Sequence, residues 1–177
     1  TQTSPVNTQT NNSNLQTDTS NWKIYKNIHG FEFKYPESLR LIETSPKITL
    51  NHTIPFKNYG DCDMMGDGTI SNDLTDFNLS FEIVPKVNLS FKDGDYSKGI
   101  LKGAWVYEGA EGCGPINYYF PYSDKTLVIK RENIQILSGV RNNADERKVI
   151  LSTPGAISKE QNQIMFDQIL STFKFTK

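Results

Sequence analysis

The residues best suited to chemistry lie in one Asp- and Gly-rich stretch. Asp61, Asp63 and Asp67 place three carboxylates within seven residues, and Gly66 and Gly68 allow tight turning. Oxygen ligands that converge in such a loop bind Ca²⁺. The stretch therefore predicts a weak calcium site. The alternative is an Asp/Gly turn in which the carboxylates accept hydrogen bonds from nearby backbone N–H groups.

The spacing of these aspartates departs from that of an EF-hand loop. With Asp61 at the first position, Met65 would stand at the fifth and Asn72 at the twelfth, where an EF-hand has its bidentate Glu. No helical pattern flanks the stretch. A calcium site here would therefore be of another type.

The chain has two cysteines, and each lies in a Gly-rich segment. Cys62 follows Gly60 by two residues, and Cys113 comes directly after Gly112. Two cysteines in a chain with features of an exported domain predict one disulfide. In the chain-entropy model, closing a loop of about 50 residues stabilises the fold by about 4 kcal/mol. The alternative is two free thiols, one of them reactive.

Sequence motifs of enzymes are missing. There is no Gly-x-Ser-x-Gly and no His-Glu-x-x-His, and Gly109–Gly114 lacks the Gly-Lys-Ser/Thr of a P-loop. His29 stands in a predicted turn and His52 in a predicted loop. We expect both to be turn or surface residues, and we expect no enzymatic activity.

An aromatic cluster spans residues 118–122. Alternation along a strand sends Tyr118 and Phe120 to one face and Tyr119 to the other. Tyr119 and Tyr122, if turned outward, would form a binding patch. The alternative is a covered core or an ordinary edge-strand surface.

Composition excludes several classes of protein. The 177 residues carry a net charge of −1, which argues against binding to nucleic acid or to an anionic membrane, since both need a basic face. No apolar run approaches the roughly 18–20 residues that span a bilayer. Aromatic and β-branched residues are common, which favours a sheet-rich single domain.

The first 21 residues are almost entirely Thr, Asn, Gln and Ser, with Val6 and Leu15 the apolar exceptions. Such a segment buries too little surface to offset its ordering entropy. It predicts a flexible linker ahead of one domain at 22–177. This layout is typical of a mature bacterial lipoprotein, anchored through a lipid-bearing Cys upstream of the sequence. We therefore expect an exported protein at the cell surface or in the periplasm. The alternative is an N-terminus that serves only as a spacer.

The most regular pattern in the chain is the period-two stretch from Trp22 to Tyr35. It predicts a β-hairpin with its turn at Gly30. In the first strand, Trp22, Ile24 and Ile28 form the apolar side that the pattern predicts to be buried.

Further strands are predicted by the same alternation, at 39–41, 48–50, 77–83, 105–107, 116–120 and 127–131. A loop is predicted from about 58 to 76, a short helix at 95–102, and a solvated loop at 141–148.

The closing element is predicted to be a helix. Ser158 and Gln161 have the spacing of a capping box, and an apolar stripe follows with helical offsets, made of Phe166, Ile169, Leu170 and Phe173. Burial of this stripe contributes on the order of 6–12 kcal/mol before entropy. It requires an apolar sheet face, and the opening hairpin is the candidate.

Both ends of the predicted domain resemble PsbP-like and Mog1-like domains, and also uncharacterised bacterial lipoproteins with a similar hairpin. The resemblance lies in Trp22, Tyr25, Gly30-Phe31-Glu32-Phe33 and Tyr35-Pro36, and in Phe166–Phe175. It implies an α+β fold in which a twisted antiparallel sheet of about six to eight strands is covered by a C-terminal helix. The family commonly has an aromatic residue shortly after Tyr-Pro, where this chain has Ser38-Leu39.

The resemblance implies an exported accessory or binding protein, and it carries over no catalytic residue. We therefore expect a non-enzymatic envelope protein that binds a partner protein or a surface glycan. The alternative is a calcium-stabilised extracellular interaction or assembly module that uses Asp61, Asp63 and Asp67.

Overall fold

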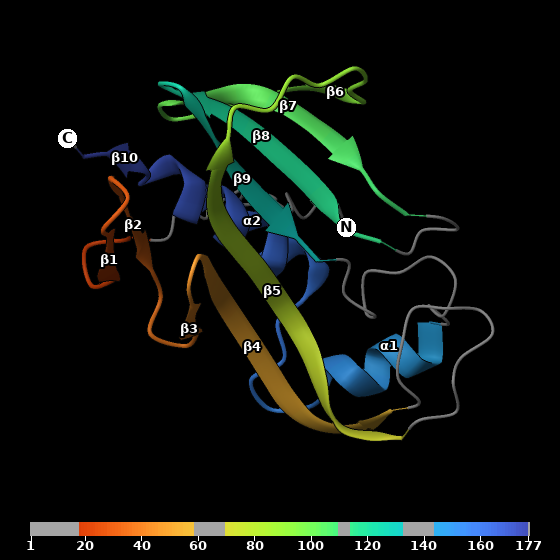
Figure 1. Ribbon diagram of the computed structural model, residues 1–177. Helices are drawn as coiled ribbons and strands as arrows, with labels where there is room; N and C mark the ends of the chain where they lie inside the picture. The colour runs from red at the N-terminus through yellow and green to blue at the C-terminus, as the bar shows by residue number, and fades with distance from the viewer. Residues whose placement is uncertain (1–17, 59–69, 110–113, 133–143, 177) are drawn as a thin grey trace, which may run out of the picture.

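The described part of the chain forms two antiparallel sheets and two helices. The structure, a computed structural model, describes residues 18–58, 70–109, 114–132 and 144–176. Within these residues there is a three-stranded sheet with the order β1-β2-β10 and a seven-stranded sheet with the order β3-β4-β5-β9-β8-β7-β6 (Figure 1). The fold is α+β, and the prediction of a mainly antiparallel sheet is confirmed.

The opening hairpin is present as predicted. Strands β1 (Lys23–Asn27) and β2 (Phe31–Tyr35) pair antiparallel, and the short strand β10 (Lys174–Phe175) extends the sheet on the other side of β2. Gly30 in the turn has a φ of +97°, and a Cβ there would lie 2.7 Å from the carbonyl oxygen of Thr176. The turn therefore requires glycine for both conformation and space.

The prediction of the buried side of β1 was wrong. Ile24 and Ile28 are 57% and 93% exposed, whereas Tyr25 is 9% exposed. The register between β1 and β2 decides which side of β1 is buried. Tyr25 pairs with Phe33, which is 1% exposed. Directly opposed residues share one face of a sheet. Ile24 is consequently left on the outer face of this edge strand, and Ile28 is exposed in the turn that follows it.

The large sheet contains all six further strands that the sequence predicts. Its members are β3 (Arg40–Thr44), β4 (Lys47–Asn58), β5 (Ser71–Pro85), β6 (Gly94–Lys98), β7 (Leu101–Tyr107), β8 (Ile116–Tyr122) and β9 (Lys125–Arg131). Two expectations were wrong: residues 71–76 belong to β5 and not to a loop, and residues 95–102 form most of the β6–β7 hairpin and not a helix.

The β6–β7 hairpin replaces the predicted helix for two reasons. Gly99 has a φ of +57°, which suits a tight turn and not a helix interior. Tyr96 also packs its ring edge-on against Tyr118 at a centroid distance of 4.8 Å, and that contact fixes the strand on the core.

Helix α1 (Ala144–Leu151) lies where a solvated loop was predicted at 141–148, so that prediction was wrong for 144–148; residues 141–143 lie outside the described part of the chain. Ile150 is 4% exposed and packs with Ile54 and Leu74 in a second core cluster. Tertiary packing of this one apolar side chain holds a polar segment against the sheet as a helix.

Helix α2 (Lys159–Ser171) begins at the predicted capping box. The Ser158 hydroxyl accepts from Gln161 N at 3.1 Å, and the Gln161 side chain accepts from Ser158 N at 2.9 Å. The predicted stripe is buried, with Phe166, Ile169 and Leu170 at 0% exposure and Phe173 at 2%.

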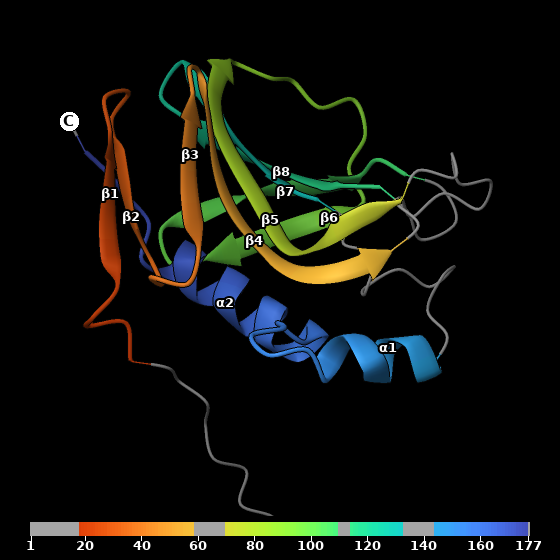
Figure 2. The ribbon, with the colours of Figure 1, turned by 90° about the horizontal axis from the view of Figure 1, so that it is seen from below.

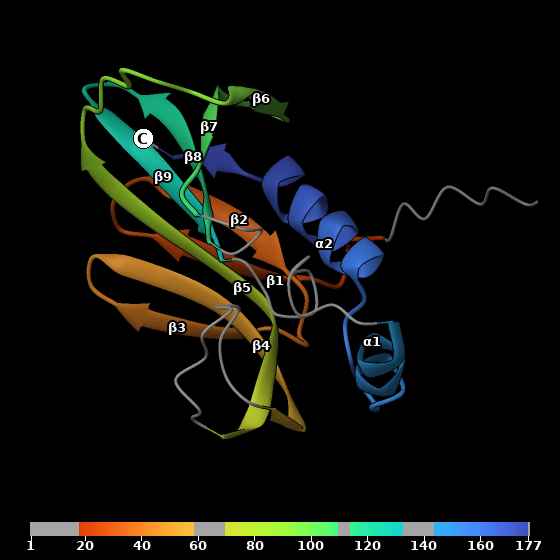
Figure 3. The same cartoon turned by 90° about the vertical axis from the view of Figure 1, so that its right-hand side faces the viewer.

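The small sheet and α2 share one core with the large sheet. The Phe173 ring lies 5.2 Å from that of Phe31 and 5.7 Å from that of Phe33, and Phe33 stacks on Phe81 of β5 at 4.5 Å. Figures 2 and 3 show α2 along one face of the large sheet, with the β1–β2 hairpin beside β3. The hairpin therefore forms part of the surface on which α2 packs, as predicted.

Candidate functional site

Five of the seven predicted site residues lie outside the described part of the chain. They are Asp61, Cys62, Asp63, Asp67 and Cys113. The calcium site and the disulfide therefore stay predictions. Among residues 18–58, 70–109, 114–132 and 144–176, no group of three or more His, Cys, Asp or Glu side chains could hold a metal ion.

The other two predicted residues, Tyr119 and Tyr122, are not brought together. Tyr119 lies on the opposite face of β8 from the buried Tyr118 and Phe120, and burial together with Glu108 raises the pKa of its phenol. Tyr122 stacks on Phe175 at 4.1 Å, and its hydroxyl donates to the carbonyl oxygen of Gly30 at 3.2 Å. Tyr122 therefore ties β8 to the small sheet, and the two tyrosines form no common patch.

A buried His–Asp pair is the most chemically suggestive feature of the described residues. His52 Nδ1 lies 2.5 Å from Asp76 Oδ1, and Asp76 is 0% exposed. A register shift makes this contact: His52 pairs with Phe77 but Thr53 pairs with Thr75, so Asp76 is the extra residue of a β-bulge. The bulge turns the carboxylate of Asp76 to the interior beside Phe77.

Asp76 fastens the start of α2 to the sheet. Its second carboxylate oxygen accepts from Ile157 N at 2.7 Å, and its backbone carbonyl accepts from the Asn162 side-chain amide at 2.7 Å. Hydrogen bonds to an ionised acceptor are among the stronger ones in proteins. Together these contacts fix where α2 begins on the sheet.

The network continues through Arg131 at the end of β9. The guanidinium donates to Asn162 Oδ1 and to Gln163 Oε1, each at 2.7 Å, and lies 4.8 Å from the centroid of the Phe166 ring. Arg131 also hydrogen-bonds Tyr118, whose pKa burial raises against the opposing effect of this cation. A planar guanidinium that donates to two side-chain amides and lies over an aromatic ring is well suited to hold a helix in place.

The geometry of the His52–Asp76 pair favours a structural role. Both carboxylate oxygens of Asp76 are engaged, one by His52 and one by a backbone N–H. The His52 side chain is 17% exposed, and its neighbours along the inner face of β4 are Leu50 and Ile54. A catalytic dyad would also need a nucleophile or substrate within reach of the imidazole. The contacts of the pair instead account for the attachment of α2.

The sequence did not predict this pair, although the alternation in β4 indicated the position of His52. Ile48, Leu50, Ile54 and Phe56 alternate, and His52 completes that row. Extending the alternation past Leu50 would have placed the imidazole on the inner face. Asp76 gave no such signal, because a bulge breaks the parity that alternation depends on.

The cavity of interest on the surface lies between the two N-terminal hairpins. It has a volume of about 280 Å³ and is lined by residues 25–29 of the first hairpin and by residues 43 and 45–48 of the second. A chain of hydrogen bonds forms one wall: His29 N donates to Asn27 Oδ1 at 2.7 Å, and Asn27 Nδ2 donates to the Tyr25 hydroxyl at 3.1 Å. Burial raises the pKa of the Tyr25 phenol, the hydrogen bond from Asn27 opposes this rise, and the negative charge of Glu43 adds to it.

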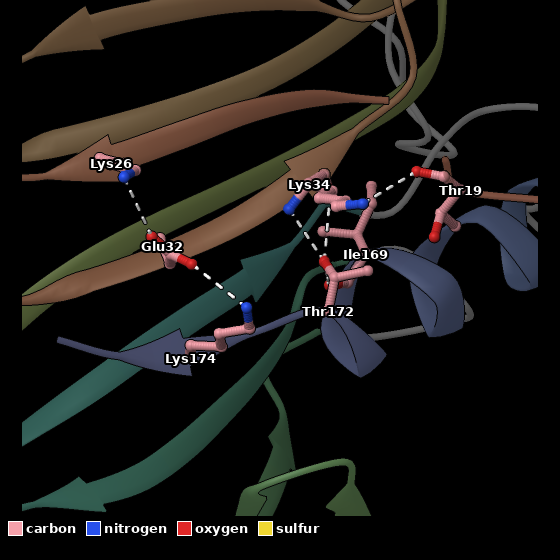
Figure 4. A network of polar contacts seen from close by, with 7 residues as sticks. All are labelled: Thr19, Lys26, Glu32, Lys34, Ile169, Thr172 and Lys174. Carbon is pink, nitrogen blue, oxygen red and sulfur yellow. Dashed lines mark hydrogen bonds and ion pairs between the residues drawn. The ribbon is translucent and has the colours of Figure 1, made fainter. Parts of the chain in front are cut away.

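Polar contacts hold the small sheet together and attach it to the C-terminal end of α2 (Figure 4). Glu32 lies between two lysines, 3.8 Å from Lys26 Nζ and 3.5 Å from Lys174 Nζ. Lys34 N donates to the Thr172 hydroxyl at 2.8 Å, at the C-terminal end of α2. The first hairpin is therefore held at both edges of β2, and β1 is its free edge.

Comparison with known proteins does not place the chain in a family. No family model matches the chain, and no curated protein matches it. In the described part of the chain, neither helix has the length and apolar character required to cross a membrane.

Proposed function

We propose that this chain is a non-enzymatic, exported accessory protein of the cell envelope that binds a partner protein or a surface glycan. The observation that carries the proposal is that the two polar sites differ in their contacts. The hydrogen bonds of the buried His52–Asp76 pair hold α2 on the sheet. The cavity between the hairpins is open and lined by groups suited to recognition, among them Tyr25, Glu43 and Lys47.

The N-terminal sequence supports export and tethering. Residues 1–21 have the composition of a spacer, and the two cysteines suit an oxidising compartment. The hairpin and closing helix add support for a PsbP-like or Mog1-like domain of the kind found in exported lipoproteins, because the residues that carry the resemblance lie at the centre of the core. Phe31, Phe33, Phe166 and Phe173 are each at most 2% exposed.

Affinity capture from the envelope fraction of the native host tests the proposal. The immobilised protein should enrich a specific protein or glycan, and that partner should be recovered with its intact mass unchanged. An exposed variant at a residue that does not line the cavity, Asp124→Asn in the β8–β9 turn, serves as the matched control. A partner that is cleaved or modified in a manner that depends on His52 would contradict the proposal, as would the absence of any specific enrichment.

A further inference from the structure

Two free strand edges face one another across the cavity between the hairpins. Strand β1 is the end strand of the three-stranded sheet, and β3 is the end strand of the seven-stranded sheet. In Figure 2 the two strands run in the same direction, and residues 25–29 line the same cavity as residues 43 and 45–48. The outer edge of each strand presents backbone N–H and C=O groups without a strand partner.

The outer face of this gap is apolar. Ile24 and Ile28 come from the first hairpin and Ile42 from β3, and they are 57%, 93% and 36% exposed. Large apolar side chains on the outer face of edge strands are normally avoided, because they invite pairing with another chain. On both sides of this gap they stand where the alternate side chains of an added strand would lie.

The inner side of the gap is polar. The charge of Glu43 acts on the Tyr25 phenol across it, and Tyr25 packs on the buried Phe33 with ring centroids 5.3 Å apart. A strand laid in the gap would rest on this pair. Its inward side chains would meet hydroxyl, amide and carboxylate groups.

Two lysines and one carboxylate line the cavity, namely Lys26, Lys47 and Glu43. Lys26 is already close to Glu32, at 3.8 Å, whereas Lys47 forms no ion pair with a described carboxylate. Lysines on an edge disfavour unselected strands, and they favour one that carries acidic side chains.

We propose that an extended acidic segment of the partner protein, in which β-branched apolar and acidic residues share one face, adds as a strand between β1 and β3. Its backbone pairs with the two free edges. Ile24 and Lys26 lie on one face of β1, and Ile42 and Lys47 lie on one face of the second hairpin. On that face its apolar side chains cover Ile24 and Ile42, and its carboxylates approach Lys26 and Lys47. This is recognition by strand addition, in which main-chain hydrogen bonds give affinity and alternate side chains give specificity. The inference rests on the proposed binding function and names the class of partner.

An NMR titration of the full chain with a synthetic peptide tests the inference. The probe is an acetylated and amidated octapeptide in which valine and glutamate alternate at the odd positions and threonine fills the even positions, added to about 2 mM so that millimolar dissociation constants are detected. We expect chemical shift changes at the amides of 23–29 and 40–47. Replacement of every glutamate by lysine, or N-methylation of alternate peptide nitrogens, should abolish them. Unchanged spectra with the first peptide, changes that map elsewhere, or equal binding of the lysine peptide would overturn the inference.

Variants of the protein separate this inference from the proposed function. Ile24→Lys with Ile42→Lys should weaken peptide binding about tenfold or more, since it removes apolar cross-strand pairs and adds charges that the strand would cover. Ile100→Lys, at an apolar residue that is 52% exposed in the β6–β7 turn, should bind normally. If the double variant captures the native partner as well as wild type does, the inference fails and the binding function stands. If no form captures a partner, the binding function itself fails.

Discussion

At the scale of single residues, Asp76 is the side chain on which most of the described architecture depends. It is fully buried and joins β4, β5 and the start of α2. A buried carboxylate is stable only when its oxygens are satisfied. The bulge in β5 and the approach of Ile157 N together provide that satisfaction.

Asp76→Ala should destabilise the fold by about 3 kcal/mol, because it leaves the Ile157 N–H and the imidazole of His52 without their shared acceptor. Urea unfolding followed by circular dichroism measures the loss. Asp124→Asn, at an exposed turn position, is the control and should change stability by less than about 0.5 kcal/mol. Equal stability of the two variants would show that Asp76 does not fasten α2.

Tyr96 gives the fold a dependence on alkaline pH. Burial first, and the charge and hydrogen bond of Asp167 next, raise the pKa of this phenol well above its ordinary 10.0. The neutral phenol therefore contributes its stability in full below about pH 10 and loses it as pH rises further, where the unfolded chain ionises first.

Tyr96→Phe should lower stability at neutral pH by about 1 kcal/mol, through loss of the 3.1 Å bond to Asp167. The decline in its free energy of unfolding between about pH 10 and 11.5 should be shallower than that of wild type. Unfolding curves at several pH values provide the comparison, and identical slopes would refute the assignment.

At the scale of elements, helix α2 is defined by its cap and its apolar stripe. The capping box at Ser158 satisfies backbone donors at the start of the helix, and the stripe is covered by both sheets. Ser158→Ala should cost about 1 kcal/mol, measured by thermal unfolding against the exposed control Ser90→Ala. A loss at Ser158 no larger than that at Ser90 would contradict the role of the cap.

Sequence predicted those elements whose signal is periodic and local. The hairpin, six further strands and the closing helix followed from alternation, from Gly30 and from the capping box. The errors arose where distant contacts decide: Ile150 holds a polar segment as α1, and Tyr96 holds a weak helical segment as β6. The candidate site was harder to predict from the sequence, because the register between β1 and β2 exposes Ile24 and the bulge in β5 buries Asp76.

At the scale of the whole molecule, the described residues combine a cavity between the two N-terminal hairpins with a covered polar network. The predicted disulfide and calcium loop lie outside the described residues. Intact mass after alkylation, with and without prior reduction, tests the Cys62–Cys113 bond. We expect no labelled cysteine before reduction and two after it, and two labels before reduction would disprove the disulfide.

The calcium prediction is tested separately by calorimetric titration. Addition of Ca²⁺ at millimolar concentration should give a saturable heat if Asp61, Asp63 and Asp67 form a weak site. Asp63→Asn should reduce that heat, and Asp124→Asn should preserve it. A flat trace with wild type would leave these aspartates as turn residues.

The central claim is that the protein acts by binding at its surface gap, while its buried His–Asp pair is structural. The most direct test measures the dissociation constant of the captured native partner for three forms of the chain by calorimetry. We predict that His52→Gln stays within about twofold of wild type and that the double variant Ile24→Lys and Ile42→Lys binds about tenfold or more weakly, a change of about 1.4 kcal/mol. Loss of binding or of partner turnover on His52→Gln, with normal binding by the double variant, would contradict it.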